Sequence, residues 1–284
     1  MTVKIFGILG DPIQHSLSPE MFGFYFRKKR LPCLYLRFHV GKEGLGRFVE
    51  KCRGWGLAGF NVTIPHKETI LPFLDQIDPT ARRLGAVNTV SIRGDRLIGH
   101  NTDATGYLSS LRNETRFRPR GKSVLILGAG GACRAILYAL CQQGTKKIFL
   151  ANRTRLRAVA LARRFKKIFP KVKILAIPLT VQRLSPIFPK IDLLINTAAV
   201  GLGGTRHKQL PPLRLLPRQA IVSDIIYRPL KTALLKEAKM GRLRTHGGAG
   251  MLLHQAVLAY RIWTGKRPDL KIMRKGLLDA LKED

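Results

Sequence analysis

The sequence predicts an α/β protein in which one domain is inserted into another. Short apolar runs typical of strands alternate with amphipathic stretches typical of helices through most of the chain, the pattern of parallel sheets joined by right-handed crossovers. A polar stretch at 112–122 separates two such series, and polar residues typical of a ligand site occur both before it and near the C-terminus, in "GGAGMLLHQA". We therefore expect a discontinuous first domain made of residues 1–103 and 247–284, with an inserted domain over 104–246.

Apolar patterning predicts the elements of the first domain, because strands alternate or run apolar and helices show an amphipathic period. The expected elements are strands at 4–9, 33–40 and 57–64, helices at 18–30, 46–55, 67–74, 79–84, 249–264 and 269–282, and a hairpin formed by 85–93 and 96–103. The hairpin is expected to turn at Gly94-Asp95, a favoured pair for a two-residue turn. Ser18 is expected to cap its helix, with Pro19 at the first helical position.

The inserted domain shows short apolar segments separated by helical stretches. The expected strands lie at 123–128, 146–152, 171–177, 192–197 and 220–226, and the expected helices lie at 131–143 and 154–168. This alternation predicts a parallel sheet with helices as crossovers, as in Rossmann-like domains.

The composition excludes several classes of protein. Hydrophobic residues make up 45% of the chain and charged residues 24%, which is typical of a folded soluble protein. We expect no membrane span, because no run of about 18 apolar residues is present, and no signal peptide at the start. The four cysteines are scattered, and they are Cys33, Cys52, Cys133 and Cys141. Scattered cysteines suit reduced thiols, so we expect a cytoplasmic protein without a metal site or a disulfide.

The net charge is unusual: the chain has 51 basic and 17 acidic residues, which gives +34. A field of this sign attracts polyanions. The basic residues occur in nearly every segment, and neither zinc-finger spacing nor an aromatic RNA-binding signature is present. We therefore expect no specific nucleic-acid partner. Two explanations of the positive charge stay open. It speeds the encounter with anionic ligands, or it reflects a general bias in the surface composition of the source organism's proteins.

A glycine-rich turn stands between the first strand and the first helix of the inserted domain. In "SVLILGAGGACRA" the turn contains Gly128, Ala129, Gly130, Gly131 and Ala132. Glycines let the backbone approach a phosphate, and the helix start beyond them offers N–H donors. The strand–turn–helix context and a second strand at the expected distance favour a dinucleotide site. A tight turn without a ligand is the alternative.

Arginines follow the second strand of this domain, where an NAD-binding domain would carry a carboxylate for the ribose. The segment "NRTRLR" places Asn152, Arg153, Thr154, Arg155 and Arg157 here. Arginine suits the 2′-phosphate of NADP through bidentate charge-assisted hydrogen bonds, so we expect NADP, with Arg153 as the main ligand and Asn152, Thr154 and Arg157 beside it. A helix cap is the alternative for Thr154, and a solvated helix face is the alternative for Arg155 and Arg157.

Short polar clusters lie at strand ends and at one helix start in residues 1–106. Ligands bind beyond the carboxyl ends of strands in open α/β sheets, and these groups would suit a small polyhydroxylated acid. The residues are Ser16, Ser18, Asn61, Thr63, Lys67, Asn88, Asn101, Thr102 and Asp103. Structural alternatives exist for several of them: Ser18 as a helix cap, Asn88 and Asn101 as hairpin residues, and Lys67 as a solvated lysine.

Several segments together match one known family. In chain order they are "HSLSP", "GFNVTIPHK", "LGAVNT", "GHNTDATG", "LGAGGA", "NRT", "DIIYRPLKTALL", "GGAGMLLHQA" and "WTGKRP". Over essentially its whole length the chain resembles the shikimate dehydrogenase family. The resemblance implies NADP-dependent, reversible reduction of 3-dehydroshikimate to shikimate in aromatic amino-acid biosynthesis. It also implies a Rossmann-like NADP-binding domain inserted in a discontinuous α/β substrate domain.

The resemblance implies roles for individual residues. Lys67 and Asp103 are expected to form the catalytic acid–base pair. The residues expected to bind the carboxylate or the hydroxyls of the substrate are Ser16, Ser18, Asn61, Thr63, Lys67, Asn88, Asp103, Tyr227 and Gln255. The residues expected to bind NADP are Gly128, Ala129, Gly130, Gly131, Ala132, Asn152, Arg153, Thr154, Arg157 and Gly250.

The sequence departs from the family pattern at three places. The segment "DATG" (103–106) replaces the common Asp-Gly opening of the linking helix, although Gly106 remains. Ala198 and Ala199 stand where a hydroxyl side chain is usual, and Gly248 stands where an acidic or other residue is often found. Two alternative functions stay open: a quinate or dual quinate/shikimate dehydrogenase, and a binding or regulatory protein of the same fold without turnover. A small-molecule substrate and a monomer or homodimer are expected in the catalytic case.

Overall fold

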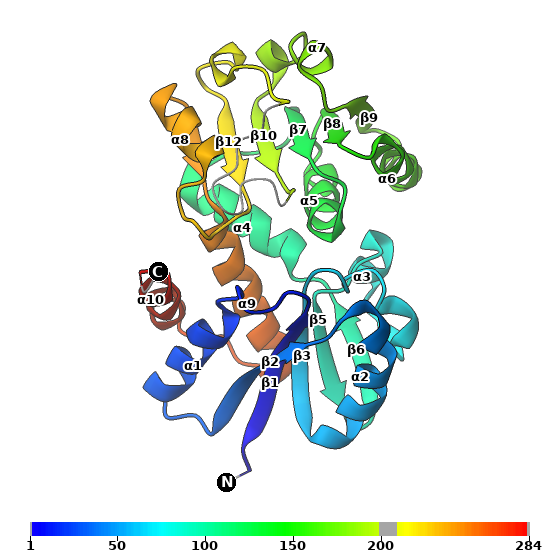
Figure 1. Cartoon of the computed structure of the whole chain (residues 1–284), viewed down its shortest axis with the longest axis vertical. Coiled ribbons are helices and arrows are strands. Elements are labelled where there is room, and N and C mark those ends of the chain that lie inside the picture. The colour runs from blue at the N-terminus through cyan, green and yellow to red at the C-terminus, as the bar shows by residue number, and fades with distance from the viewer. Residues whose placement is uncertain (1, 199–208, 283–284) are drawn as a thin grey trace. The chain divides into compact units, whose positions relative to one another are not determined.

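The computed structural model describes residues 2–198 and 209–282 (Figure 1). The chain forms two compact units. The first consists of Met1–Gly106 and Leu253–Asp284, and the second of Tyr107–Leu252. The chain passes between them inside two helices, α4 (Asp103–Thr115) and α9 (Gly248–Thr264). The domain boundaries expected at 103/104 and 246/247 thus stay predictions, three and six residues from where the compact units divide.

The first unit contains a six-stranded mixed sheet in the order β2-β1-β3-β5-β6-β4. Its strands are β1 (Lys4–Gly10), β2 (Cys33–His39), β3 (Leu57–Val62), β4 (Gln76–Ile77), β5 (Thr89–Arg93) and β6 (Arg96–His100). Strands β1, β2 and β3 are parallel, whereas β5 runs antiparallel to both β3 and β6. The expected hairpin is confirmed, since the pairing of β5 and β6 closes at Arg93 and Arg96 across Gly94-Asp95.

Helices cover both faces of this sheet. On one face, α1 (Ser18–Lys28) and α9 pack against Phe6, whose ring stacks on Trp263 at 5.0 Å between centroids. The helix α10 (Leu270–Ala280) lies beside α1 (Figure 1). On the other face, α2 (Leu45–Cys52) contributes buried Phe48 and Val49 to a core that includes Phe60 of β3. Because this core fixes β1 and β3, the carboxyl ends of both strands are held in place.

Two predicted details of the first unit are wrong. Ser18 does not cap its helix: Leu17 holds that position, because the N–H of Met21 already bonds to the Leu17 carbonyl at 3.1 Å. No α-helix spans 67–74, where the chain makes turns and a short 3₁₀ helix, Leu71–Phe73. The Lys67 carbonyl accepts instead from the N–H of Val87 at 2.8 Å, which removes it from a helical ladder. The short helix α3 (Pro79–Leu84) is confirmed.

The second unit contains a six-stranded sheet in the order β13-β12-β10-β7-β8-β9, and all its described pairings are parallel. Its strands are β7 (Ser123–Leu127), β8 (Lys147–Asn152), β9 (Lys173–Pro178), β10 (Leu193–Asn196), β12 (Ile221–Asp224) and β13 (Arg244–His246), and its own helices are α5 (Gly131–Gln142), α6 (Arg155–Ile168), α7 (Val181–Leu184) and α8 (Ala233–Met240). The predicted Rossmann-like architecture is confirmed.

Side chains of the second sheet alternate between two cores. Val222 of β12 belongs to a core that includes Leu234 and Leu235 of α8, whereas its neighbour Ser223 accepts a hydrogen bond from Tyr107 of α4 at 3.1 Å. Helices therefore cover both faces, as in doubly wound folds. Among the residues that the structure describes, none of the helices is both long and apolar enough for a membrane span.

Candidate active site

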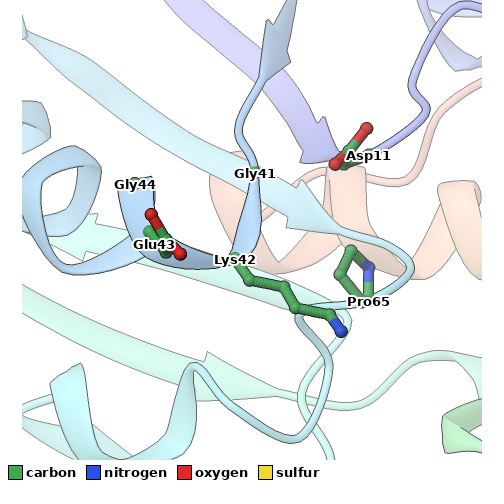
Figure 2. Close-up of a pocket in the computed structure, with 6 residues that line it drawn as sticks. All are labelled: Asp11, Gly41, Lys42, Glu43, Gly44 and Pro65. Atoms are coloured by element: carbon green, nitrogen blue, oxygen red, sulfur yellow. The ribbon is translucent and has the colours of Figure 1, made fainter.

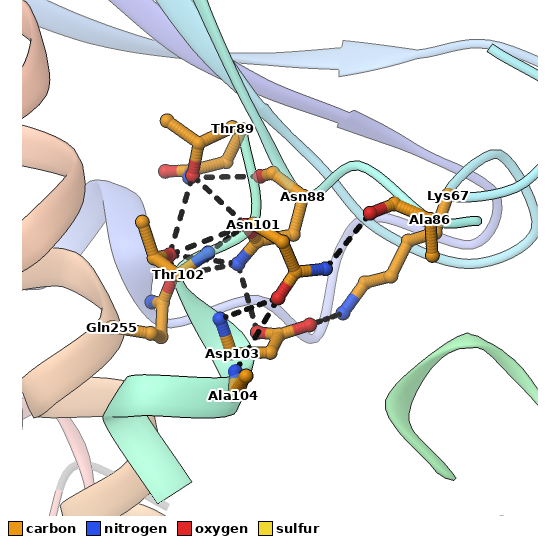
Figure 3. A network of polar contacts seen from close by, with 10 residues as sticks. Lys67, Ala86, Asn88, Thr89, Asn101, Thr102, Asp103, Ala104 and Gln255 are labelled. Carbon is orange, nitrogen blue, oxygen red and sulfur yellow. Dashed lines mark hydrogen bonds and ion pairs between the residues drawn. The ribbon is translucent and has the colours of Figure 1, made fainter. Parts of the chain in front are cut away.

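Lys67 and Asp103 form a partly buried ion pair at the edge of the first sheet (Figure 3). Lys67 lies in the turn after β3, and Asp103 is the first residue of α4. Their Nζ and Oδ2 atoms are 2.6 Å apart, and the side chains are only 15% and 5% exposed. An ammonium and a carboxylate at this distance form a charge-assisted hydrogen bond, which fixes the position of the Lys67 amine.

Two side chains and the start of a helix hold the Asp103 carboxylate and its backbone in place. The amide of Asn88 donates to Oδ1 of Asp103 at 2.8 Å. The side chain of Asn101 accepts from the N–H groups of Asp103 and Ala104, at 3.1 and 3.3 Å, and so caps the start of α4. The positive end of the α4 dipole also stabilises a carboxylate at this position. Asp103 is thereby oriented independently of any ligand.

Asn88 is the centre of the polar network drawn in Figure 3. Its Oδ1 accepts from the N–H of Thr102 at 2.7 Å and from the Thr89 hydroxyl at 3.1 Å. Its Nδ2 donates to Asp103, and at 3.4 Å to Oε1 of Gln255, which comes from α9. All the side chains in this network except Lys67 and Asn101 are buried, so their hydrogen bonds replace those that water would make.

The network continues from Asn61 toward the start of α1. The hydroxyl of Tyr35 donates to Oδ1 of Asn61 at 2.7 Å, and Nδ2 of Asn61 donates to Oγ1 of Thr89 at 3.0 Å. Tyr35 is also hydrogen-bonded to Ser18, and burial raises the pKa of its phenol well above the usual value. The N–H of Ser18 donates to Oγ of Ser16 at 3.4 Å. The structure thus links six predicted substrate residues, Ser16, Ser18, Asn61, Asn88, Asp103 and Gln255, to Lys67.

Two predicted substrate residues lie outside this chain of hydrogen bonds. Thr63 is half-buried at the end of β3, and its methyl group packs against Gly10. Tyr227 belongs to the second unit, where it follows Ile226, whose N–H donates to the buried carboxylate of Asp224 at 3.1 Å. Their roles therefore stay predictions.

The glycine-rich turn of the second unit fits a phosphate group. Gly128 has φ +110°, and a Cβ there would stand 2.5 Å from Oγ1 of Thr197, so the turn requires glycine. At Gly130 no described atom lies within 4 Å of the position that a Cβ would take. Gly130 precedes α5 without a side-chain cap, so the N–H groups at the start of that helix can donate to an anion.

The predicted 2′-phosphate ligands lie at the end of β8, the strand next to β7. Arg153, Thr154 and Arg157 are exposed, and the side chain of Asn152 donates to the Thr154 carbonyl at 2.9 Å. Thr154 is the residue before α6, although its side chain makes no capping hydrogen bond. Exposed guanidinium groups at this strand end suit a phosphate ligand. The residues of the second unit therefore fit NADP.

Three family models match the chain. They are the shikimate dehydrogenase substrate binding domain over residues 8–90, the shikimate/quinate 5-dehydrogenase model over 112–199 and the shikimate 5′-dehydrogenase C-terminal domain over 248–278. A shikimate dehydrogenase (NADP(+)) of Geobacter metallireducens is 42% identical to the chain, and the match covers 98% of this chain and 97% of that protein. The chain belongs to the shikimate dehydrogenase family.

Solved structures of this family are similar in fold. A shikimate 5-dehydrogenase of Thermus thermophilus, solved with NADP(H) and shikimate, is 37% identical with a TM-score of 0.86, over 98% of this chain and all of that one. A quinate dehydrogenase of Corynebacterium glutamicum, solved with NAD, is 29% identical with a TM-score of 0.88, over 98% and 99% of the two chains. The fold is thus shared by relatives that bind different cofactors.

The departures from the shikimate dehydrogenase pattern have partial explanations. A Cβ on Gly248 would stand 2.0 Å from the carbonyl oxygen of Ile225, so no larger residue fits there without a shift of the backbone. A Cβ on Gly250 would meet Oε1 of Glu114 and Oγ of Ser110, so this glycine packs tightly against α4. The N–H of Ala198 donates to the side chain of Asn196 at 3.1 Å. Ala199 lies outside the described residues.

Sequence reasoning missed two members of the site, Tyr35 and Thr89, and did not predict the burial of the neighbouring His66. Tyr35 lies in the middle of β2, and Thr89 begins β5, so both fit the alternation of an ordinary strand. His66 precedes Lys67 and is fully buried, with one ring nitrogen 2.5 Å from the Val40 carbonyl. The one sequence signal for His66 is its position next to Lys67 in the segment "GFNVTIPHK".

A shallow cavity of about 440 Å³ lies elsewhere on the same sheet edge (Figure 2). It is lined by Asp11, Gly41, Lys42, Glu43, Gly44 and Pro65, and Lys42 extends toward Pro65. None of these residues belongs to the polar network around Asn88. The candidate active site is therefore the network and not this cavity.

Proposed function

We propose that this chain catalyses the reversible NADPH-dependent reduction of 3-dehydroshikimate to shikimate in aromatic amino-acid biosynthesis. The observation that carries the proposal is the ion pair between Lys67 and Asp103, 2.6 Å apart inside a network of amides and hydroxyls. The family membership supports the same reaction. We assign the substrate to the first unit and NADP to the second.

The catalytic pair supplies the proton chemistry. Bound NADPH supplies the hydride. As the substrate carbonyl becomes an alkoxide, the ammonium of Lys67 stabilises the developing charge and donates a proton to the oxygen. Asp103 holds the Lys67 amine in position. In the reverse direction the pair accepts the proton from the substrate hydroxyl.

The polar network positions the substrate. Ser16 and Ser18 would bind its carboxylate, with Tyr227 nearby, and the amides of Asn61, Asn88 and Gln255 would bind its hydroxyls together with Thr63. A site of buried, prearranged hydrogen-bond partners discriminates strongly against molecules that lack the matching hydroxyl. This favours a polyhydroxylated ring acid over a simple ketone.

The cofactor contacts follow from the fit of the second unit to NADP. The turn from Gly128 to Ala132 would bind the pyrophosphate through backbone N–H groups, with Ala129, Gly130 and Gly131 between them. Arg153 and Arg157 would bind the 2′-phosphate with Asn152 and Thr154, and Gly250 would border the nicotinamide.

We place the enzyme in the cytoplasm, as a monomer or homodimer. The described cysteines are free thiols, which supports the cytoplasmic location.

A spectrophotometric assay at 340 nm tests the function. The purified chain is mixed with NADPH and 3-dehydroshikimate, and in parallel with NADH, and the reverse reaction is run with shikimate and with quinate. We expect the highest kcat/KM with NADPH and 3-dehydroshikimate. Preference for quinate and NAD would instead assign the chain to the quinate alternative. Tight binding of shikimate without turnover would assign it to a regulatory homologue.

A further inference from the structure

The charge of the chain is concentrated in one part of the second unit. Residues 115–191 contain 18 Lys and Arg residues and no Asp or Glu residue, whereas the whole chain has 51 basic and 17 acidic residues. This stretch therefore contributes more than half of the net charge of +34 from little more than a quarter of the chain. The proposed reaction uses only Arg153 and Arg157 of these cations.

The densest part of this charge lies at one edge of the second sheet. Strand β9 is the edge strand, β8 pairs with it, and α6 packs on both. The β8–α6–β9 basic surface is formed by Lys146, Lys147, Arg153, Arg155, Arg157, Arg163, Arg164, Lys166, Lys167, Lys171 and Lys173. All of these residues are exposed except Lys147, which is half-buried with its amine 4.6 Å from the centre of the Phe149 ring.

Helix α6 buries a narrow apolar stripe and carries six cations on its other side, where Leu156 and Ala160 are also exposed. The stripe is Ala158, Leu161, Ala162 and Phe165. Like charges three and four residues apart on a helix repel one another, and the stretch supplies no carboxylate to offset them. This arrangement costs stability in the free protein, and a polyanion bound along the helix would remove that cost.

The chemistry of the surface favours a phosphate backbone over bases. Phe149 and Phe165 are buried and Phe169 is half-buried, so the surface has no exposed aromatic ring on which a single-stranded base could stack. Helix α6 has 14 residues and is about 21 Å long, and duplex DNA presents one charge per about 1.7 Å of its axis. The cations therefore face several phosphates at once.

We propose that the β8–α6–β9 basic surface binds the phosphodiester backbone of duplex nucleic acid without reading its sequence. Binding of this kind comes from the release of counterions, so it weakens steeply as salt is raised. It requires neither the catalytic pair nor the substrate network. It is also compatible with the absence of any motif for specific recognition.

Two matched variants test the proposal by fluorescence anisotropy with a labelled DNA duplex of mixed sequence. The first variant replaces Arg163, Lys166, Lys167 and Lys171 with Gln. The control replaces Lys51, Lys271, Lys275 and Lys282 with Gln; these lysines are also exposed but belong to the first unit. Both variants lose four positive charges, so they differ only in where the charge is removed. Thermal unfolding and NADPH turnover confirm that both stay folded.

We expect the first variant to bind the duplex about tenfold or more weakly than the unmodified protein at about 100 mM salt, with the slope of log K against log salt reduced by roughly three. The control should bind within about twofold of the unmodified protein. Equal weakening in both variants would overturn the proposal, because binding would then follow net charge alone. Absence of duplex binding at low salt, or tighter binding to poly-glutamate or to anionic lipid vesicles, would overturn it as well.

Discussion

Asn88 is the residue on which the geometry of the site depends most. Its single amide contacts the backbone N–H of Thr102, the Asp103 carboxylate and the side chain of Gln255. Burial of an amide costs little free energy when both its oxygen and its NH₂ group are hydrogen-bonded. Burial of a carboxylate that lacks its hydrogen-bond donor costs much more. Asn88 therefore fixes Asp103, and through it Lys67, in the position that the proposed chemistry needs.

We propose that single residues also decide the cofactor preference. We expect Arg153→Gln to raise KM for NADPH by about 10- to 100-fold, because it removes charge-assisted hydrogen bonds worth about 1.5–3 kcal/mol. KM for NADH, which has no 2′-phosphate, should change little. Arg155→Gln removes a neighbouring exposed guanidinium and is the control. Equal changes for both cofactors on Arg153→Gln would show that this residue does not contact the 2′-phosphate.

At the scale of elements, a buried polar cluster joins α4 to β12 and β13. His246 of β13 is 1% exposed, and its ring nitrogens lie 2.9 Å from Oγ of Ser223 and 2.8 Å from Oγ of Ser110. Ser110 also donates to the carboxylate of Glu114 at 2.9 Å. Because Gly250 packs against Ser110 and Glu114, this cluster sets the start of α9.

Burial of His246 makes the stability of this cluster depend on pH. Burial lowers the pKa of His246 to about 4, below the usual value near 6.5. The native state therefore binds fewer protons than the unfolded state between these values, so its stability is complete above about pH 6.5 and falls as the pH drops toward 4. The loss from this single group amounts to about 3 kcal/mol.

We expect His246→Gln to lower the free energy of unfolding at neutral pH by about 1–3 kcal/mol, because Ser110 and Ser223 lose hydrogen-bond partners. The same variant should depend less on pH than the unmodified protein between about pH 6.5 and 4. Urea unfolding at a series of pH values measures both effects. An unchanged pH dependence would show that His246 does not stay neutral in the folded protein.

At the scale of the whole molecule, most strands were predicted because the apolar runs of a parallel sheet are continuous and easy to recognise. Strands β4 and β13 are only two and three residues long, too short for any period. The helix expected at 67–74 fails because Lys67 gives its carbonyl to Val87, a partner that local sequence does not reveal. At 67–74 this tertiary hydrogen bond outweighs the local preference for a helix.

The site was predictable to the extent that its residues fall in short polar motifs after strands. Lys67, Asn88 and Asp103 were found in this way, whereas Gln255, inside α9, was expected only from the family resemblance. The structure brings all four together. Tyr35 was not, because an aromatic residue inside an alternating strand is indistinguishable from a core residue until its hydroxyl has a partner. Sequence patterns thus identify residues that take part in the proposed chemistry more readily than residues that only hold those residues in position.

The central claim is that Lys67, held by Asp103, transfers the proton. The most direct test is the steady-state rate of NADPH oxidation with 3-dehydroshikimate for Lys67→Ala, with Lys42→Ala as the control for loss of an exposed lysine on the same sheet edge. We predict that Lys67→Ala lowers kcat by about 10²- to 10⁴-fold, whereas Lys42→Ala leaves it unchanged. A normal kcat with a raised KM for 3-dehydroshikimate in Lys67→Ala would contradict the claim and leave Lys67 as a substrate anchor only.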